Sequence, residues 1–163
     1  MKKIFVQYAH YNVWANQLIT ECIVNLSDEQ LHKEIKSSFP SVYLTLLHLW
    51  DVESVWWQRV KLQEVVEWPG VHFDGSVLEL VNNLMRQSKQ WAEWIDIATE
   101  TVLEHEFIYK NSKKDQYKQP VYEVLQQLFN HQTFHRGQLI TMLRQVGLEK
   151  LPGTDIITFL RKK

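Results

Sequence analysis

The sequence predicts an all-α protein whose helices form a four-helix bundle. Apolar residues recur at steps of three and four along four long segments, the pattern of helices with one buried face. One long segment between them, residues 64–75, has no helical period and contains one Pro and two Gly, which indicates a crossover connection. The length of 163 residues suits a single domain, 1–163, with a full hydrophobic core. Together these observations favour four helices with one long crossover.

The first half of the chain is expected to contain two of the long helices. The first is predicted over residues 3–26, where a heptad-like apolar stripe runs along one face. Ser27 and Gln30 have the spacing of a capping box, which predicts a short helix over 28–35. The second long helix is predicted over 40–63, because the proline at its start suits the first turn of a helix.

The second half is expected to contain the other two long helices and a small β-hairpin. Ser76 and Glu79 have the spacing of a second capping box and predict a helix over 76–101. A β-hairpin is predicted over 107–117, where apolar and aromatic residues flank a polar turn. The hairpin precedes the last long helix, and residues 155–160 are expected to form a final short turn that closes the bundle.

The last long helix, predicted from Pro120 to Gly147, contains the most informative pattern of the sequence. His131 and His135 lie one turn apart on its apolar stripe, so both imidazoles are expected to be buried. A buried imidazole needs a partner for its polar nitrogens. Two imidazoles at positions i and i+4 can bind one metal ion from the same side of a helix.

A third histidine, His48, lies on the apolar stripe of the helix predicted over 40–63. Three imidazole ligands leave a fourth tetrahedral position open, which is typical of catalytic zinc sites. An H-x-x-x-H pair alone is common on helices, but a third histidine on another buried stripe favours a metal site over core packing. We therefore predict that His48, His131 and His135 bind a divalent metal ion. Zinc is the favoured ion, and nickel and iron are alternatives.

Four nearby residues have a functional and a structural interpretation. Asp51 follows His48 by one turn and could orient it, or could face solvent or a neighbouring helix. Arg136 could contact an anionic substrate, although a surface salt bridge is favoured. Gly137 in a helix interior costs roughly 1 kcal/mol relative to Ala, so close helix packing is expected there. Cys22 lies on an apolar stripe and is expected to be an inert core thiol.

Composition excludes several classes of protein. The 18 basic and 19 acidic residues give a net charge of −1 with no basic stripe, which argues against binding nucleic acid. No apolar run approaches the length of a membrane span. Cys22 is the single cysteine, so no intrachain disulfide can form and a reducing compartment fits. We expect a cytoplasmic protein without a membrane or nucleic-acid partner.

Four stretches of the sequence match one known family. They are YNVWAN at 11–16, SVYLTLLHL at 41–49, NHQTFHRGQL at 130–139, and the chain end with Pro152 and 155–157. On these stretches the chain resembles the DinB/YfiT-like family of candidate metalloenzymes, over nearly its whole length. The resemblance implies an up-down-down-up bundle with the long crossover between the second and third helices. It also implies that the three histidines are the metal ligands and that the protein is a homodimer, which fits apolar surface left on a Trp-rich bundle.

The resemblance further implies a metal-dependent enzyme that transfers groups to or from low-molecular-weight thiols such as bacillithiol or mycothiol. A cationic site would favour this chemistry by lowering the pKa of a bound thiol. Metal-dependent hydrolysis is an alternative reaction. No Glu follows a helical histidine in an HExxH arrangement, so a metalloprotease is disfavoured. The competing class is a non-catalytic metal-binding protein of a stress response, as the family name suggests.

Overall fold

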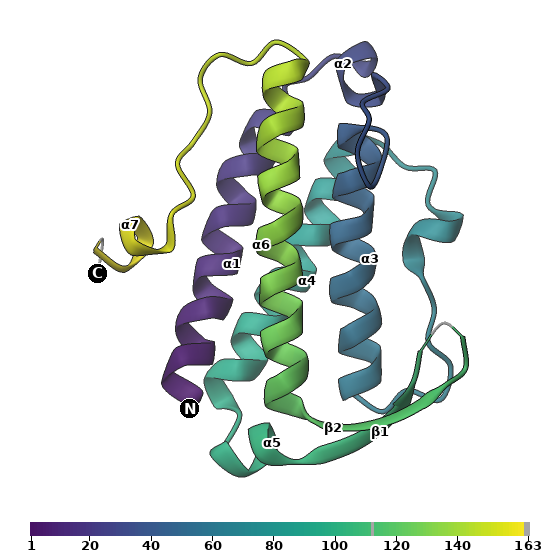
Figure 1. Cartoon of the computed structure of the whole chain (residues 1–163), viewed down its shortest axis with the longest axis vertical. Coiled ribbons are helices and arrows are strands. Elements are labelled where there is room, and N and C mark those ends of the chain that lie inside the picture. The colour runs from purple at the N-terminus through teal and green to yellow at the C-terminus, as the bar shows by residue number, and fades with distance from the viewer. Residues whose placement is uncertain (112, 162–163) are drawn as a thin grey trace.

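The computed structural model describes residues 1–111 and 113–161 and contains four long helices packed side by side (Figure 1). Along the chain these helices run up, down, down and up. The long connection between the second and the third returns the chain to the end of the bundle at which the second began. This arrangement confirms the predicted fold class. The four helices are α1 (Lys2–Ile23), α3 (Val42–Val60), α4 (Val77–Ile97) and α6 (Val121–Gln145).

Both predicted capping boxes are present. At the start of α4 the Ser76 hydroxyl accepts the N–H of Glu79 at 3.3 Å, and the Glu79 carboxylate accepts the N–H of Ser76 at 2.8 Å. Ser27 and Gln30 form the same reciprocal pair at the start of the short helix α2 (Asp28–His32). Each box satisfies backbone N–H groups that have no partner within the helix, which fixes where the helix begins.

The loop between α2 and α3 is longer than the sequence predicted. The short helix ends before the predicted limit of 28–35, because the chain turns to bury Ile35 in the core. The Ile35 N–H donates to the carbonyl of Pro40 at 3.0 Å, which closes the loop. Ser41 then caps α3, so Pro40 lies outside the helix that it was expected to start. We call residues 33–41 the α2–α3 loop.

The helix predicted over 76–101 is in fact two helices. α4 ends at Ile97, and the backbone becomes extended before Thr99. The Thr99 hydroxyl accepts the N–H of Val102 at 3.2 Å and so starts a new helix, α5 (Glu100–Glu104). The prediction missed this break because the apolar spacing continues across it.

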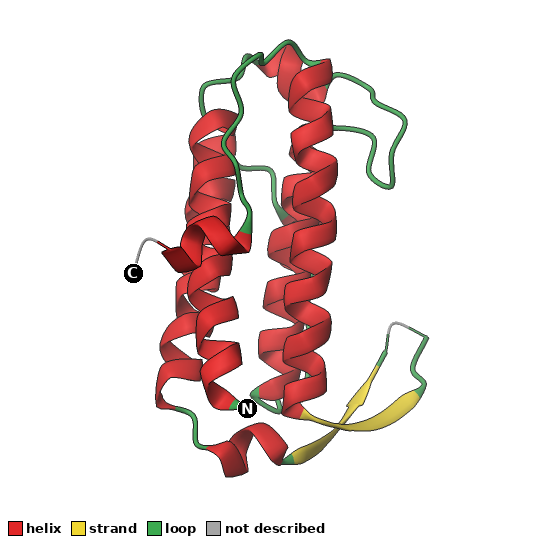
Figure 2. Ribbon diagram, turned by 60° about the vertical axis from the view of Figure 1, so that its left-hand side comes forward, coloured by secondary structure: helices red, strands yellow, loops and turns green. Residues whose placement is uncertain are grey.

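The predicted β-hairpin is confirmed and leads directly into α6. Its strands, β1 (Glu106–Lys110) and β2 (Gln116–Pro120), pair antiparallel with Glu106 opposite Pro120. Figure 2 shows the hairpin extending sideways from one end of the bundle. Ser112, in the predicted turn, lies outside the described residues.

The crossover between α3 and α4 is fixed against α3. It contains one turn of 3-10 helix, η1 (Pro69–His72), and is otherwise irregular. The Gly70 N–H donates to Asp51 Oδ1 at 2.6 Å. A Cβ at Gly70 would lie 2.5 Å from the Asp51 carboxylate, so a larger residue here would displace that carboxylate from its bond to the crossover. The crossover therefore runs along the outer side of the helix that carries His48.

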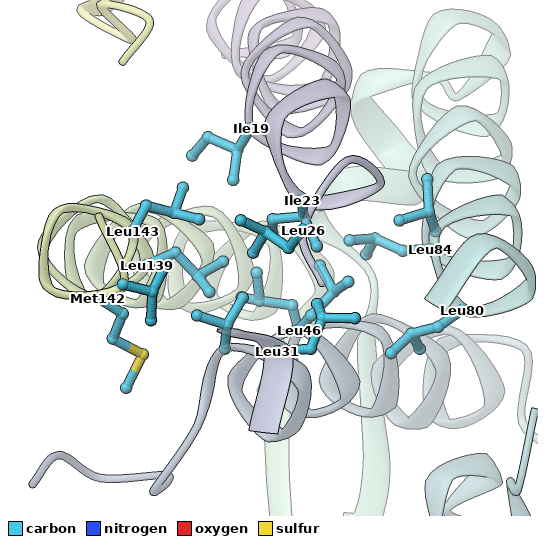
Figure 3. Packing of buried hydrophobic residues seen from close by; sticks show 14 of the residues in the cluster. Ile19, Ile23, Leu26, Leu31, Leu46, Leu80, Leu84, Leu139, Met142 and Leu143 are labelled. Carbon is cyan, nitrogen blue, oxygen red and sulfur yellow. The ribbon is translucent and has the colours of Figure 1, made fainter. Parts of the chain in front are cut away.

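The hydrophobic core has two parts, one toward each end of the bundle. One part surrounds Leu46, Leu80 and Leu139 next to α2 (Figure 3), and the other surrounds Trp91 and Leu125 next to the hairpin. On α1, α4 and α6, buried polar residues lie between the two parts along the helix. They are Asn12 and Asn16 on α1, Gln87 and Ser88 on α4, and Gln132, His135 and Arg136 on α6. Within the described residues, no helix is both long and apolar enough to span a membrane.

The chain end packs against the outside of α1. The predicted final turn is the short helix α7 (Ile156–Arg161), and its Phe159 ring contacts Tyr11 and Trp14 with centroid distances of 6.1 Å and 5.5 Å. Figure 2 shows α7 crossing the bundle from the outside. The apolar residues of the chain end therefore cover part of the first helix, as expected.

Candidate metal centre

The three predicted histidines come together in the middle of the bundle. His48 projects from α3, and His131 and His135 project from successive turns of α6. Each offers one ring nitrogen such that all three nitrogens lie within 4.8 Å of one another. The Nε2 atoms of His48 and His131 are 2.9 Å apart. Residues 83 positions apart along the chain thus form one cluster, because α3 and α6 pack against each other.

The environment of this cluster keeps the imidazoles neutral. Burial, together with the neighbouring imidazole of His135, lowers the pKa of His48 to about 4. The same causes, with His48 added, lower the pKa of His131 to about 3. Burial also lowers the pKa of His135. A neutral imidazole presents a lone pair, which is the form that binds a metal ion.

The hydrogen bonding of the cluster is incomplete. His131 Nδ1 is buried and has no hydrogen-bond partner among the described residues. The Nε2 atoms of His48 and His131 are 2.9 Å apart, so one ring can donate its proton to the other in the metal-free protein, and a bound cation would take the place of that proton. Buried polar atoms are normally paired, so this cluster has room for an external partner.

The donor set fits a divalent transition metal. It consists of three imidazoles, and within the described residues no Cys, Asp or Glu side chain joins the group. Three imidazole nitrogens suit zinc, and also nickel or iron, better than magnesium or calcium, which prefer oxygen ligands. A tetrahedral ion held in this way would keep one position for a ligand from outside the protein.

Two residues that the sequence analysis did not select complete the surroundings of the cluster. The ring of Phe39, from the α2–α3 loop, stacks on His48 with a centroid distance of 4.0 Å and an interplanar angle of 26°. Gln138 Oε1 lies 2.7 Å from His135 Nδ1. The spacing of Gln138, three residues after His135 on one helix, could have suggested this contact. No pattern in the sequence could have placed Phe39, because its position depends on how the loop folds back.

Asp51 binds the crossover and not His48, which it could have oriented according to one of its two interpretations. Its carboxylate accepts the N–H of Gly70, and burial raises the pKa of that carboxyl group. Asp51 therefore fixes the crossover to α3, which is a structural role.

The expectation that Gly137 marks close helix packing is wrong. A Cβ at this position would meet no other atom within 4 Å.

Cys22 is half-buried against the core, and burial raises the pKa of its thiol, which disfavours the reactive thiolate. The interpretation of Cys22 as an inert thiol therefore fits the structure.

The prediction of a surface salt bridge for Arg136 is also wrong. Its side chain is buried, and its guanidinium donates to Asn12 Oδ1, to Asn16 Oδ1 at 3.0 Å and to Thr133 Oγ1 at 3.0 Å. Asn12 and Asn16 are buried on α1, so two of these bonds lie inside the bundle. The prediction failed because the apolar period of α6 does not distinguish a charged residue with buried partners from one at the surface.

The buried polar residues on the other helices explain the position of Arg136. Asn12 Nδ2 donates to Glu53 Oε1 at 2.8 Å, and the Ser88 hydroxyl donates to Glu53 Oε2 at 2.8 Å. Each of Asn12 and Asn16 therefore donates to Glu53 and accepts from Arg136. We call these five residues, Asn12, Asn16, Glu53, Ser88 and Arg136, the buried ionic network. It joins all four long helices.

A separate groove lies over the first half of α6. It has a volume of about 1090 Å³ and is lined in part by aromatic side chains, among them Tyr8, Trp56 and Tyr109. None of the three histidines lines it. The groove is therefore distinct from the histidine cluster, and the aromatic rings next to the cluster are those of Phe39 and Phe134.

The sequence of this chain is similar to the sequences of known proteins. The model of the DinB family matches residues 1–162. Protein DinB of Bacillus subtilis (strain 168) is 31% identical over 168 residues, which cover 92% of this chain and 90% of that protein.

Two solved structures share the fold. A DinB-like protein of Bacillus subtilis has a TM-score of 0.69 at 16% identity, covering 91% of this chain and 98% of its own. A DinB-like protein of Bacillus cereus ATCC 10987 has a TM-score of 0.69 at 22% identity, covering 91% and 94%. At these identities the likeness concerns the fold alone.

Proposed function

The chain belongs to the DinB family, and we propose that it is a metal-dependent enzyme that acts through His48, His131 and His135. The observation that carries this proposal is the convergence of three neutral imidazoles with an unpaired buried nitrogen and no fourth protein ligand among the described residues. A structural zinc site has four protein ligands, whereas three are typical of catalytic sites. Zinc is the favoured ion, with nickel and iron as alternatives.

We propose that the reaction is transfer to or from a low-molecular-weight thiol. A divalent cation, when bound, supplies a Lewis acid that favours the deprotonated form of a thiol. Such a nucleophile needs no general base in the protein. The cluster contains no carboxylate, and the nearby Asp51 is occupied by Gly70, which supports thiol transfer over hydrolysis with a protein base.

The residues around the cluster have definite tasks in this proposal. The α6 helix holds His131 and His135 one turn apart, and α3 supplies His48 from the facing side. The rings of Phe39 and Phe134 lie against His48 and His135 and exclude water from part of the site. Exclusion of water strengthens the interaction of the cation with a bound anion such as a thiolate.

The test has two stages. Purified protein is loaded separately with zinc, nickel and iron(II), and the bound metal is measured by elemental analysis after gel filtration. The loaded protein is then assayed with low-molecular-weight thiols and a panel of electrophiles. We expect one ion per chain and thiol consumption that depends on it. Metal binding without reaction would favour the non-catalytic metal-binding stress protein, and hydrolysis of an ester or amide without thiol would favour the hydrolase.

We also propose that the protein is a cytoplasmic homodimer. Apolar side chains remain exposed on α1 and α6, among them Ile4 (56%) and Phe134 (60%), and exposed apolar surface of this kind favours self-association. Light scattering across micromolar concentrations should give twice the chain mass. A constant monomer mass would contradict the proposal.

A further inference from the structure

We propose that Gln138 is a positioning residue of the metal centre that connects His135 to the α2–α3 loop, whose Phe39 covers the site. The inference rests on the proposed metal site. It deepens that proposal by naming what sets the orientation of one ligand and what controls entry to the ion.

Gln138 determines which ring nitrogen of His135 is available to a metal ion. Gln138 Oε1 lies 2.7 Å from His135 Nδ1, and a carbonyl oxygen can only accept a hydrogen bond. The proton of the neutral His135 ring is therefore held on Nδ1, and the lone pair is on Nε2. A hydrogen bond to the non-ligating nitrogen fixes both the tautomer and the ring orientation of a metal-binding histidine.

The nitrogen of the Gln138 amide binds the α2–α3 loop. Gln138 Nε2 donates to the Ser38 hydroxyl at 3.0 Å, 100 residues away along the chain. Ser38 belongs to the α2–α3 loop, which is closed by the bond between Ile35 and Pro40. Gln138 thus fixes the middle of a loop whose ends are already held by α2 and α3.

Phe39, the residue next to Ser38, lies against the histidine cluster. Phe39 stacks on His48 at 4.0 Å and lies 5.7 Å from the His135 ring, centroid to centroid. Its ring therefore covers two of the three imidazoles. The bond from Gln138 to Ser38 holds the loop in the position where this cover is in place. Loss of that bond would free the loop and let an ion enter and leave faster.

The two bonds of Gln138 make separable predictions. Gln138→Leu keeps the size of the side chain but removes both bonds. Gln138→Glu keeps an acceptor for His135 and lets the Ser38 hydroxyl act as the donor. Ser38→Ala removes the loop bond alone. Gln126→Leu is the matched control, since Gln126 is an exposed glutamine on the same helix.

The experiment measures the His135 tautomer in metal-free protein by nitrogen NMR of the histidine side chains. Zinc affinity is then measured by competition with a chelator, and zinc release by transfer to excess chelator. Wild type and Gln138→Glu should show the proton on Nδ1. Gln138→Leu should lose this preference and bind zinc roughly 10–100-fold more weakly. Ser38→Ala should keep the tautomer and the affinity of wild type but release zinc faster, and Gln126→Leu should match wild type.

The outcomes separate this inference from the proposed function. An unchanged tautomer and unchanged zinc affinity in Gln138→Leu would overturn the positioning role. Unchanged zinc release in Ser38→Ala would overturn the role of the loop bond. If wild type binds no zinc, nickel or iron, the proposed function fails. The tautomer measurement in metal-free protein still decides whether Gln138 orients His135.

Discussion

His135 and Arg136 are neighbours on α6, yet they belong to two polar clusters whose hydrogen bonding differs. In the buried ionic network most polar atoms are paired: Glu53 accepts bonds from three side chains, the two terminal nitrogens of Arg136 have acceptors, and Arg136 Nε has no partner among the described residues. The histidine cluster is open, with Nε2 atoms that face each other and an unpaired His131 Nδ1. Two consecutive residues of one helix thus belong to a cluster whose charges have partners inside the protein and to a cluster whose ring nitrogens converge without a carboxylate.

The difference shows how a buried polar group reveals its role. Burial of a charge is tolerated when the protein supplies its partners, and the network then stabilises the position of all four helices. Burial of His131 Nδ1 without a hydrogen-bond partner among the described residues costs stability in the metal-free protein. Such a cost is expected where a bound ion restores the balance.

The largest effect on stability is expected from Arg136→Met. Removing the guanidinium leaves the Asn12 and Asn16 oxygens without donors and Glu53 without its charge partner, so the free energy of unfolding should fall by about 3–5 kcal/mol. Urea unfolding measures the change. Arg144→Met, at an exposed position near the end of the same helix, should change it little. Equal effects of the two substitutions would mean that the network is not a stabilising unit.

His131→Ala is expected to affect the response to zinc more than the stability of the metal-free protein. This substitution removes a ligand, so zinc should no longer raise the melting temperature, whereas wild type should gain about 2.7 kcal/mol at 100 times the dissociation constant. In metal-free protein the cost should be smaller than for Arg136→Met, because an unpaired buried nitrogen disappears as well. His32→Ala, outside the cluster, should keep the response to zinc. If His131→Ala kept the response to zinc, His131 and His135 would be packing residues of the core and not metal ligands.

Stability should depend on pH in opposite directions in the two clusters. Burial lowers the pKa of His131 from 6.5 to about 3, so the unfolded chain binds more protons in that interval and stability falls as pH drops below 6.5. Burial raises the pKa of Glu53 from 4.5 to about 7, so the folded chain binds more protons there and stability falls as pH rises through that interval.

Variants should separate these two contributions. Between pH 4.5 and 6.5, His131→Ala should make the slope of unfolding free energy against pH less positive, and Glu53→Gln should make it more positive. Urea unfolding of metal-free protein at several pH values measures both slopes. Slopes that change in the same direction would contradict the assignment.

The smallest effect is expected from Gly137→Ala. The new methyl group meets no atom within 4 Å, and alanine is favoured over glycine in a helix interior by roughly 0.5–1 kcal/mol. The free energy of unfolding should rise by about that amount. A fall would mean that this turn of α6, which carries both clusters, tolerates no change, and would weaken the conclusions from His131→Ala and Arg136→Met.

The bundle and the histidine cluster could be predicted because both depend on helical periodicity. His48, His131 and His135 occur on apolar stripes, so spacing predicted that they turn toward the bundle; His135 is buried, and His48 and His131 are half-buried. The end of α4 at Ile97 could not be found in this way, because the helix stops before Thr99 while the apolar spacing continues.

The partners of individual polar residues were beyond the reach of periodicity. Arg136 was assigned to the surface because its partners Asn12 and Glu53 lie on other helices. Asp51 had two open interpretations because only the folded crossover brings Gly70 to it. Periodicity reports which face of a helix is buried. It does not report which side chains meet there, and that depends on tertiary packing.

We propose that three imidazoles and no other side chain bind one divalent ion. X-ray absorption of the zinc-loaded protein tests it most directly. We predict one zinc per chain with three imidazole nitrogens at roughly 2.0–2.1 Å and one further light-atom ligand from outside the protein. In protein prepared without added thiol, a sulfur ligand at about 2.3 Å, which would then come from Cys22, or the absence of bound zinc, nickel and iron would contradict this.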